Sequence, residues 1–289
     1  MLNEHPIFLA ARTGAVAELS SLLAEDPSLA FMSNSSCKTP LMMAAIEDSA
    51  VAIEILLPVS NPLAKCPITK LTALDLAVAN GRVECSALLL NAIGWPAIAS
   101  CPSFSDWPKD LMPLNISGGH LFSIAVQHSL PLDDPRPVAI AERHVKCLAE
   151  LLARSPEPLS DDALGLLLAA AARCKNLLCF PALARAASAN FFEIEALPGR
   201  NALGFFAESI SPLKAPYVSV AFLELCDLYF QKARPRAARA SALGAIAILE
   251  GSGFQNLAHQ LSAKHERFEI LLATQSVATS APRSTSPRL

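Results

Sequence analysis

The stretch Thr39-Pro40-Leu41-Met42-Met43-Ala44-Ala45 decides how this chain is built. A similar stretch, Thr72-Ala73-Leu74-Asp75-Leu76-Ala77-Val78, follows it at a distance of a little over thirty residues. A third, His5-Pro6-Ile7-Phe8-Leu9-Ala10-Ala11, precedes it by nearly the same distance. A motif that returns at a constant spacing of this kind indicates a stack of helical repeats.

Each stretch has the features of a helix start. The side chain of Thr39 or Thr72 can accept hydrogen bonds from the free backbone N–H groups of the first turn. Proline is tolerated at the first helical position, where its missing N–H is not needed. The alanines that follow leave room for a neighbouring helix to approach closely. We therefore expect helices that begin directly after His5, Thr39 and Thr72.

A second motif follows each of these helices at a fixed offset. Gly14 precedes Leu22-Leu23, Gly81 precedes Leu89-Leu90, and Asp48 takes the place of the glycine before Leu56-Leu57. Together the linked motifs over residues 5–94 resemble the ankyrin repeat, in which this glycine turns the chain between two helices. The resemblance implies an all-α fold, an α-solenoid of stacked ankyrin-like helix-turn-helix repeats. Cys37 and Lys70 stand where the family has the glycine of its hairpin tip, so we expect short, irregular loops.

The second half of the chain carries weaker forms of the pattern. His120-Leu121-Phe122-Ser123-Ile124-Ala125-Val126 aligns with the Thr72 motif. Ala-Leu-Gly recurs at residues 163–165, 202–204 and 242–244, and in each case a possible capping residue comes just before it. These caps are Asp162, Asn201 and Ser241. This recurrence predicts degenerate ankyrin-like repeats after the first three.

These patterns divide the chain into four segments. Residues 1–94 form three clear repeats, and residues 95–118 form an insert rich in proline and tryptophan, in which we expect little helix. The insert has two possible roles: its tryptophans pack against the stack, or it binds a partner. Residues 119–273 form the degenerate repeats. Residues 274–289 are rich in Ser, Thr, Pro and Arg, and we expect them to be disordered.

Composition argues against several classes of function. The chain has 289 residues, 52% of them hydrophobic, with a formal net charge of −3. This charge gives no general attraction to nucleic acid or to acidic membranes. We see no apolar run long enough to cross a membrane, and the first repeat begins too early for a signal peptide. The eight cysteines are scattered, which fits buried thiols in a reducing cytoplasm.

The candidate catalytic and metal-binding groups are few. His144, Cys147 and Glu150 could share one helix face, but zinc needs four ligands, or three and a water, and no second His/Cys pair is visible. Cys174 and Cys179 fit core thiols. The segment 251–253, Gly-Ser-Gly, lacks the rest of a phosphate-binding motif and fits a turn between helices. Arg234, Arg236 and Arg239 form a basic cluster, read either as a solvated loop or as an anion contact. We predict no metal and no cofactor.

The resemblance also implies where a partner would bind. In the family, the two positions after the alanine pair and the loop tip before the capping threonine face the concave surface. Transferred position by position, the predicted binding residues are Arg12, Thr13, Ser35, Ser36, Lys38, Ile46, Glu47, Ile68, Thr69, Leu71, Ala79 and Asn80. They are chemically mixed, whereas the expected core positions Leu41, Ala44, Leu74 and Ala77 are small or aliphatic. Ile46 and Leu71 could instead pack against the next repeat.

From these observations we expect a non-catalytic scaffold that binds a folded partner protein and no small-molecule substrate. The alanine-rich, lysine-poor composition is typical of a GC-rich bacterial genome. The scaffold would then be a cytoplasmic adaptor, or an effector delivered to a host cell without a cleavable signal. The alternative is an enzyme whose active site lies in the degenerate C-terminal region.

Overall fold

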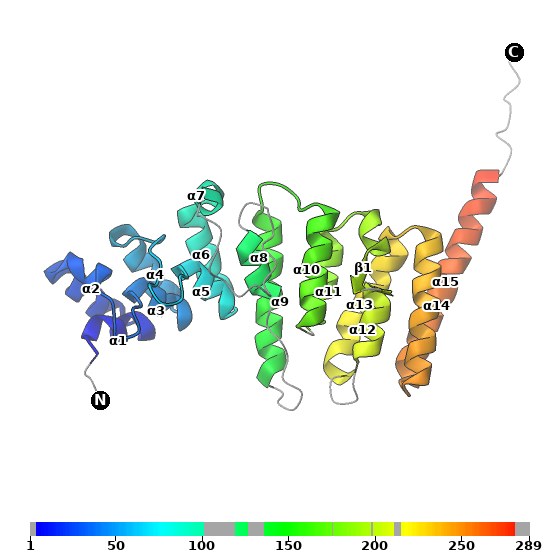
Figure 1. The fold of residues 1–289 in the computed structure, drawn as a ribbon, viewed down its shortest axis with the longest axis horizontal. Coiled ribbons are helices and arrows are strands. Elements are labelled where there is room, and N and C mark those ends of the chain that lie inside the picture. The colour runs from blue at the N-terminus through cyan, green and yellow to red at the C-terminus, as the bar shows by residue number, and fades with distance from the viewer. Residues whose placement is uncertain are drawn as a thin grey trace, which may run out of the picture. The chain divides into compact units, whose positions relative to one another are not determined.

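The computed structural model describes residues 4–100, 119–126, 136–174, 176–197, 199–210 and 215–280. These residues are mostly helical, which confirms the all-α prediction in its general form. The chain divides into two compact units, Met1–Ala187 and Ser188–Leu289, called unit 1 and unit 2 here. Figure 1 shows the helices in chain order.

Unit 1 contains helices that follow one another through short turns and loops. Their bounds are α1 Pro6–Thr13, α2 Val16–Glu25, η1 Pro27–Phe31, α3 Pro40–Ile46, α4 Ala50–Leu56, η2 Leu57–Val59, α5 Ala73–Ala79, α6 Val83–Ile93, α7 Trp95–Ser100, α8 Gly119–Val126, α9 Arg136–Arg154, α10 Asp161–Arg173 and α11 Cys179–Ala186.

The helices α1, α3 and α5 begin where the sequence predicts. His5, Thr39 and Thr72 are their N-caps, and each side chain accepts a hydrogen bond from a backbone N–H of the first turn. At Thr72 the cap is reciprocal: the Asp75 backbone N–H donates to Thr72 Oγ1 at 3.2 Å, and the Thr72 N–H donates to Asp75 Oδ2 at 2.8 Å. This capping box satisfies two N–H groups that the helix itself leaves open.

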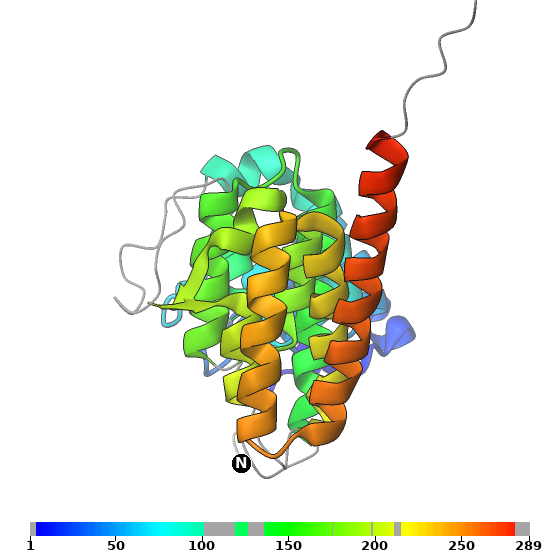
Figure 2. The same ribbon diagram turned by 90° about the vertical axis from the view of Figure 1, so that its right-hand side faces the viewer.

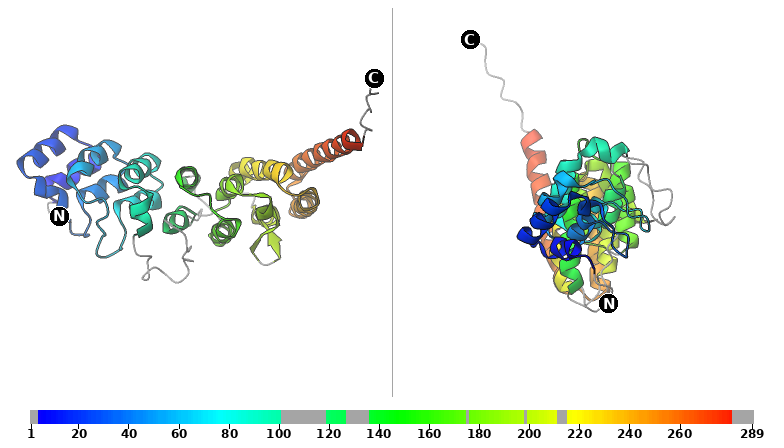
Figure 3. Two further views of the ribbon diagram at one scale, coloured as in Figure 1. Left: turned by 90° about the horizontal axis from the view of Figure 1, so that it is seen from above. Right: turned by 90° about the vertical axis from the view of Figure 1, so that its left-hand side faces the viewer.

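Unit 1 is a two-layer stack. In one layer α1 packs against α3, α3 against α5, α5 against α8, and α8 against α10. In the other layer α2 packs against α4, α4 against α6, α6 against α9, and α9 against α11. Seen from above in the left view of Figure 3, the green helices α8 and α9 are viewed nearly end-on. The core runs between the layers and is filled by fully buried side chains such as Phe8, Leu41, Leu74, Phe122 and Leu164.

The turns inside the first three helix pairs share one backbone shape. Gly14, Asp48 and Gly81 have φ values of 68°, 66° and 64°, which is the left-handed region. Glycine reaches this region at little cost, and aspartate is among the other residues that tolerate it best. Asp48 therefore performs the turn that the sequence assigned to it.

The predicted insert differs from expectation at its start. Residues 95–100 form helix α7, whereas the sequence analysis expected little helix in this insert because of its prolines. Proline is compatible with the first turn because its missing N–H has no partner there, and here it is the second helical residue. The Trp95 ring stacks on Phe122 with a centroid distance of 6.0 Å, which agrees with the expected packing role of this tryptophan. Residues 101–118, including Trp107, lie outside the described residues.

Unit 2 combines helices with one short strand pair among its described residues. Its elements are η3 Ala189–Glu193, β1 Glu195–Leu197, β2 Arg200–Asn201, α12 Ala202–Ser209, α13 Ala215–Lys232, α14 Pro235–Gly251 and α15 Gln255–Ser280. The strands are antiparallel, with Glu195 opposite Asn201 and Leu197 opposite Arg200. The sequence analysis did not predict this pair.

The core of unit 2 is aromatic. Phe192, Phe206, Phe222 and Tyr229 are fully buried, and Phe192 meets Tyr229 edge to face at a centroid distance of 4.8 Å. The helices α14 and α15 lie side by side, in orange and red in Figure 2. Helix α15 continues to Ser280, so the first part of the segment predicted to be disordered, 274–289, is helical. Residues 281–289 lie outside the described residues.

Of the three predicted N-caps of the Ala-Leu-Gly helices, one is confirmed and two are wrong. Asn201 caps α12, because its side chain accepts a hydrogen bond from the Gly204 N–H at 2.8 Å. Asp162 is not a cap, because Ser160 caps α10 two residues earlier. Ser241 is buried inside α14, which begins at Pro235, where proline is well placed to start a helix. Its Oγ instead accepts a hydrogen bond from Asn201 Nδ2 at 3.0 Å.

Candidate functional site

Six of the predicted binding residues lie at the ends of the first three helices of one layer. Arg12 and Thr13 end α1, Ile46 and Glu47 lie at the end of α3, and Ala79 and Asn80 lie at the end of α5. Direct contacts join these ends. The Arg12 guanidinium forms an ion pair with Glu47 at 3.5 Å, which links α1 to α3. Arg82 Nε donates to the Ile46 carbonyl at 2.8 Å, which links the end of α3 to the turn after α5.

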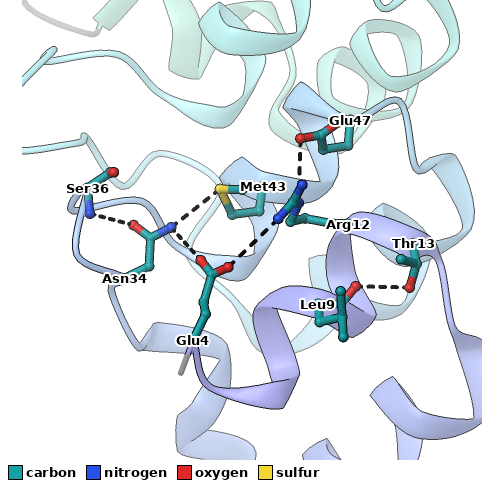
Figure 4. Close-up of polar contacts among 8 residues, drawn as sticks. All are labelled: Glu4, Leu9, Arg12, Thr13, Asn34, Ser36, Met43 and Glu47. Carbon is teal, nitrogen blue, oxygen red and sulfur yellow. Dashed lines mark hydrogen bonds and ion pairs between the residues drawn. The ribbon is translucent and has the colours of Figure 1, made fainter. Parts of the chain in front are cut away.

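Arg12 is the centre of a polar chain that the sequence analysis did not find (Figure 4). Besides Glu47, it pairs with the Glu4 carboxylate at 3.8 Å. Asn34 Nδ2 donates to the same carboxylate at 3.0 Å. These contacts connect the segment before α1, the loop before α3 and the end of α3. They join residues distant in sequence, so no local pattern could have indicated them.

The loop before α3 carries Ser35, Ser36 and Lys38. The Asn34 side-chain oxygen accepts hydrogen bonds from the backbone N–H groups of Ser36 and Lys38, both at 3.0 Å. Asparagine side chains commonly accept hydrogen bonds from nearby backbone N–H groups in turns. The presence of Asn34 in the sequence could therefore have predicted this turn. Both serines are exposed, whereas Lys38 is half-buried.

The loop before α5 carries Ile68, Thr69 and Leu71. The Cys66 N–H donates to the Leu71 carbonyl at 2.9 Å, and the Lys70 N–H donates to the Cys66 carbonyl at 2.8 Å, so the loop closes on itself. Described residues of unit 1 form no strand, which agrees with the expectation of irregular loops, but this loop spans residues 60–72 and is longer than expected. Ile68 is 67% exposed and Thr69 is exposed, whereas Leu71 is half-buried.

The two loops are neighbours in space. The Cys66 Sγ lies 3.9 Å from the Ser36 carbonyl oxygen. Burial of Cys66 favours a raised pKa for its thiol, but hydrogen bonds from Thr69 and Ile68 and the positive charge of Lys38 outweigh it, so this pKa is lowered. The two loops that carry the predicted positions thus touch at the buried Cys66.

Exposure separates the predicted residues into two groups. The side chains of Arg12 and Glu47 are 42% and 40% exposed, and Thr13 and Ala79 are also exposed. Ile46, Leu71 and Asn80 are half-buried. Asn80 Nδ2 donates to the Leu76 carbonyl at 2.7 Å, and Thr13 Oγ1 donates to the Leu9 carbonyl at 2.9 Å. The Asn80 amide and the Thr13 hydroxyl therefore donate to backbone carbonyls in the last turns of their own helices.

The residues weighed for metal binding have structural contacts instead. His144 is buried, and its Nε2 lies 2.9 Å from the Ala79 carbonyl. A carbonyl only accepts, so Nε2 carries the proton. The Cys147 Sγ lies 4.0 Å from Ser86 Oγ, and Glu150 pairs with Arg154. In the part of the chain that the structure describes, no group of three His, Cys, Asp or Glu side chains is placed to hold a metal ion.

The other candidates also have structural contacts. Cys179 is fully buried and Cys174 half-buried. Gly251 is the last residue of α14, and residues 252–254 connect α14 to α15, so the segment 251–253 lies at a turn between helices as the sequence indicated. In the basic cluster, Arg234 pairs with Glu193 at 3.3 Å, and Arg239 makes two hydrogen bonds to Glu269. Those bonds raise the pKa of Arg239 and lower that of Glu269.

Among the described residues, no helix is both long and apolar enough to cross a membrane. Comparison of the sequence with models of known protein families and with curated proteins found no match to either.

Proposed function

We propose that the chain is a non-catalytic, ankyrin-like scaffold that binds a folded partner protein. The binding surface would consist of the ends of α1, α3 and α5 and the two loops before α3 and α5. One observation carries the proposal: successive helices of one layer end side by side in exposed residues of mixed chemistry. A fixed frame with variable exposed positions is how repeat proteins present a binding surface. A bacterial adaptor or a host-directed effector would both use such a surface.

The contrast between surface and core supports the proposal. Leu41, Ala44, Leu74 and Ala77, the four expected core positions, are all at most 2% exposed. The exposed positions on the same helices carry a cation, an anion, a hydroxyl and a methyl group, at Arg12, Glu47, Thr13 and Ala79. Packing alone would not require this variety, because interior positions of a stack need only fill space.

The test is partner capture with the intact chain. Wild-type protein carrying a crosslinker is compared with the triple variant Arg12→Glu, Lys38→Glu and Glu47→Lys, in lysate of the native organism and of a candidate host. The triple variant keeps opposite charges at positions 12 and 47, so the link between α1 and α3 is retained. It loses the ion pair of position 12 with Glu4, but exposed pairs contribute little to stability, so helicity should be unchanged. Partners captured through this surface should be lost.

The control is Lys146→Glu on α9, an exposed position that changes the net charge by the same amount as the triple variant. Circular dichroism checks that all proteins are folded. A partner that the control retains and the triple variant loses supports the proposal. Capture that survives the triple variant in a folded protein contradicts it and places the binding surface elsewhere.

A further inference from the structure

The loops before α3 and α5 form one continuous surface, called the loop surface here and made of residues 35–38 and 65–71. The two loops touch where Cys66 Sγ lies 3.9 Å from the Ser36 carbonyl oxygen. Each loop is closed by its own hydrogen bonds, through Asn34 in the first and between Cys66 and Leu71 in the second. A ligand would therefore meet a preformed surface, which lowers the entropy cost of binding.

The charges of the loop surface have one sign. It carries Lys38, Lys65 and Lys70, and it contains no aspartate or glutamate. Lys65 and Lys70 are exposed and Lys38 is half-exposed. The neighbouring Glu4 carboxylate is already held by Asn34 and Arg12. At the ends of α1, α3 and α5 both signs of charge are present, with Arg12 paired to Glu47, and Arg82 paired to Asp48 at 3.7 Å.

An exposed aliphatic side chain lies among these lysines in the sequence. Ile68 is 67% exposed, the second highest exposure among the large hydrophobic side chains of the described residues. It stands two residues from Lys70 and three from Lys65. Exposed positive charge and an exposed apolar side chain thus lie within one short loop, residues 65–71.

We propose that the loop surface binds an acidic segment of the partner protein in which aspartate or glutamate alternates with aliphatic residues. This inference rests on the proposed function and names the chemistry of the partner at that site. The carboxylates would meet Lys38 and Lys70, and an aliphatic side chain would cover Ile68. Complementary charge would guide the approach of the segment, and burial of the aliphatic pair would slow its release.

Two features favour a protein ligand over a polyanion such as nucleic acid or an anionic membrane. The projecting side chain is aliphatic, whereas single-stranded nucleic acid is bound by aromatic rings that stack on its bases. The whole chain has a formal net charge of −3, so beyond the loop surface it would repel an extended polyanion. A short acidic segment avoids this repulsion because it needs only the few positive charges of the loops.

The probe is a fluorescein-labelled peptide of the repeating sequence Asp-Glu-Leu, and binding to the full chain is followed by fluorescence anisotropy. We expect binding that weakens as salt is raised from about 50 to about 300 mM, because exposed charges are screened. Lys38→Gln and Lys70→Gln should each weaken it about two- to fivefold, the range of a single exposed ion pair. Ile68→Ser should weaken it about fivefold or more, as expected of an anchor side chain.

The matched control is Lys146→Gln, which removes an exposed lysine of the same unit away from the loops and should leave the affinity unchanged. Two comparison peptides separate the contributions: one with serine in place of leucine, and one with lysine in place of the acidic residues. The first should bind more weakly than the probe and the second should not bind. A single-stranded oligonucleotide and vesicles of phosphatidylcholine with phosphatidylserine test the polyanion alternatives.

Three results would overturn the inference. The first is no binding of the acidic peptide at about 1 mM, a concentration that reveals even weak binding. The second is an equal loss of affinity in the control and the loop variants, and the third is tighter binding of the oligonucleotide or the vesicles. Its failure can be told apart from that of the proposed function. If the triple variant loses a captured partner but the acidic peptide does not bind, only the chemistry assigned to the partner is wrong.

Discussion

At the scale of single residues, burial separates leucines that look alike in the sequence. Leu74 on α5 is 2% exposed, whereas Leu9 on α1 is 54% exposed. We expect Leu74→Ala to lower the free energy of unfolding by about 2–5 kcal/mol, because it leaves a cavity between the layers. Leu9→Ala, the same change at the surface, should cost less than about 0.5 kcal/mol. Urea unfolding followed by circular dichroism measures both, and similar costs at the two sites would contradict the packing described.

A second residue-scale prediction concerns backbone strain in the loops. Cys37 and Lys70 have φ values of 57° and 59°, a conformation that side chains other than glycine rarely adopt. The left-handed conformation costs about 1–2 kcal/mol in such residues, while glycine loses more entropy on folding, by about 0.5–1 kcal/mol. Lys70→Gly should therefore raise the unfolding free energy by up to about 1.5 kcal/mol.

The control for this prediction is Lys70→Ala, which removes the charge but keeps the strain. It should leave the midpoint of urea unfolding close to that of the wild type. If both substitutions raise the midpoint equally, charge repulsion rather than backbone strain is the cause.

At the scale of elements, side-chain hydrogen bonds to helix ends join three successive helix pairs of unit 1, α3/α4, α5/α6 and α8/α9. Arg82 bonds to the Ile46 carbonyl, and His144 bonds to the Ala79 carbonyl, so a residue of the following pair closes the end of the preceding helix. A Cβ atom at Gly81 would lie 3.0 Å from Arg143 Cβ and 3.1 Å from His144 Nδ1. Its φ of 64° also disfavours alanine. Gly81→Ala should lower the unfolding free energy by about 1–3 kcal/mol.

The comparison for Gly81 is Gly244→Ala in the middle of α14. A Cβ there would meet nothing within 4 Å, and alanine favours helix over glycine by about 0.8–1.0 kcal/mol. Thermal unfolding should therefore show a lower midpoint for Gly81→Ala and an unchanged or higher one for Gly244→Ala. A tolerated Gly81→Ala would mean that α9 does not pack closely on this turn.

The contact between α6 and α9 should make stability depend on pH in the alkaline range. Burial raises the pKa of the Cys147 thiol from its ordinary 9.0 to about 11, against the hydrogen bond from Ser86 and together with the charges of Asp48 and Glu150. The folded chain thus holds this proton more tightly than the unfolded chain. The stability that the protonated Cys147 thiol contributes to the fold is fully present below pH 9 and is lost as the pH rises through 11. The thermal midpoint of Cys147→Ala should fall less between pH 9 and 11 than that of the wild type. Equal slopes would contradict this origin.

At the scale of the whole molecule, the division into two compact units predicts that the chain can be cut between them. Each unit buries its own core, and in unit 1 the helices α3, α4, α5, α6, α8 and α9 each pack against two neighbours in the same layer. A fragment of residues 1–187 should be helical and should unfold cooperatively in urea. A fragment of residues 1–154, which lacks α10 and α11, should unfold at lower urea because α8 and α9 lose their cover. A fragment 1–187 without a cooperative transition would contradict the division.

What could be predicted from the sequence depends on how far each interaction reaches. The caps at Thr39 and Thr72 act on residues three positions away, so the local pattern was sufficient. Ser241 was misread as a cap because alanine-rich sequence is helical on both sides of it, and only the position of Pro235 shows where α14 begins. The chain from Glu4 through Arg12 to Glu47 joins three segments in space. No periodicity contains this information, so only the structure could place it.

The order of packing in unit 1 also has a consequence for how the protein is made. Helices α1, α3 and α5 meet their layer neighbours in the order in which they leave the ribosome. Contacts between segments close in sequence form quickly, because little chain has to be closed into a loop. The first helix pairs can therefore fold while the second half of the chain is still being translated. Each new helix pair would pack against the pairs that have already folded. Little apolar surface would therefore be exposed during synthesis, and the chain would depend little on chaperones.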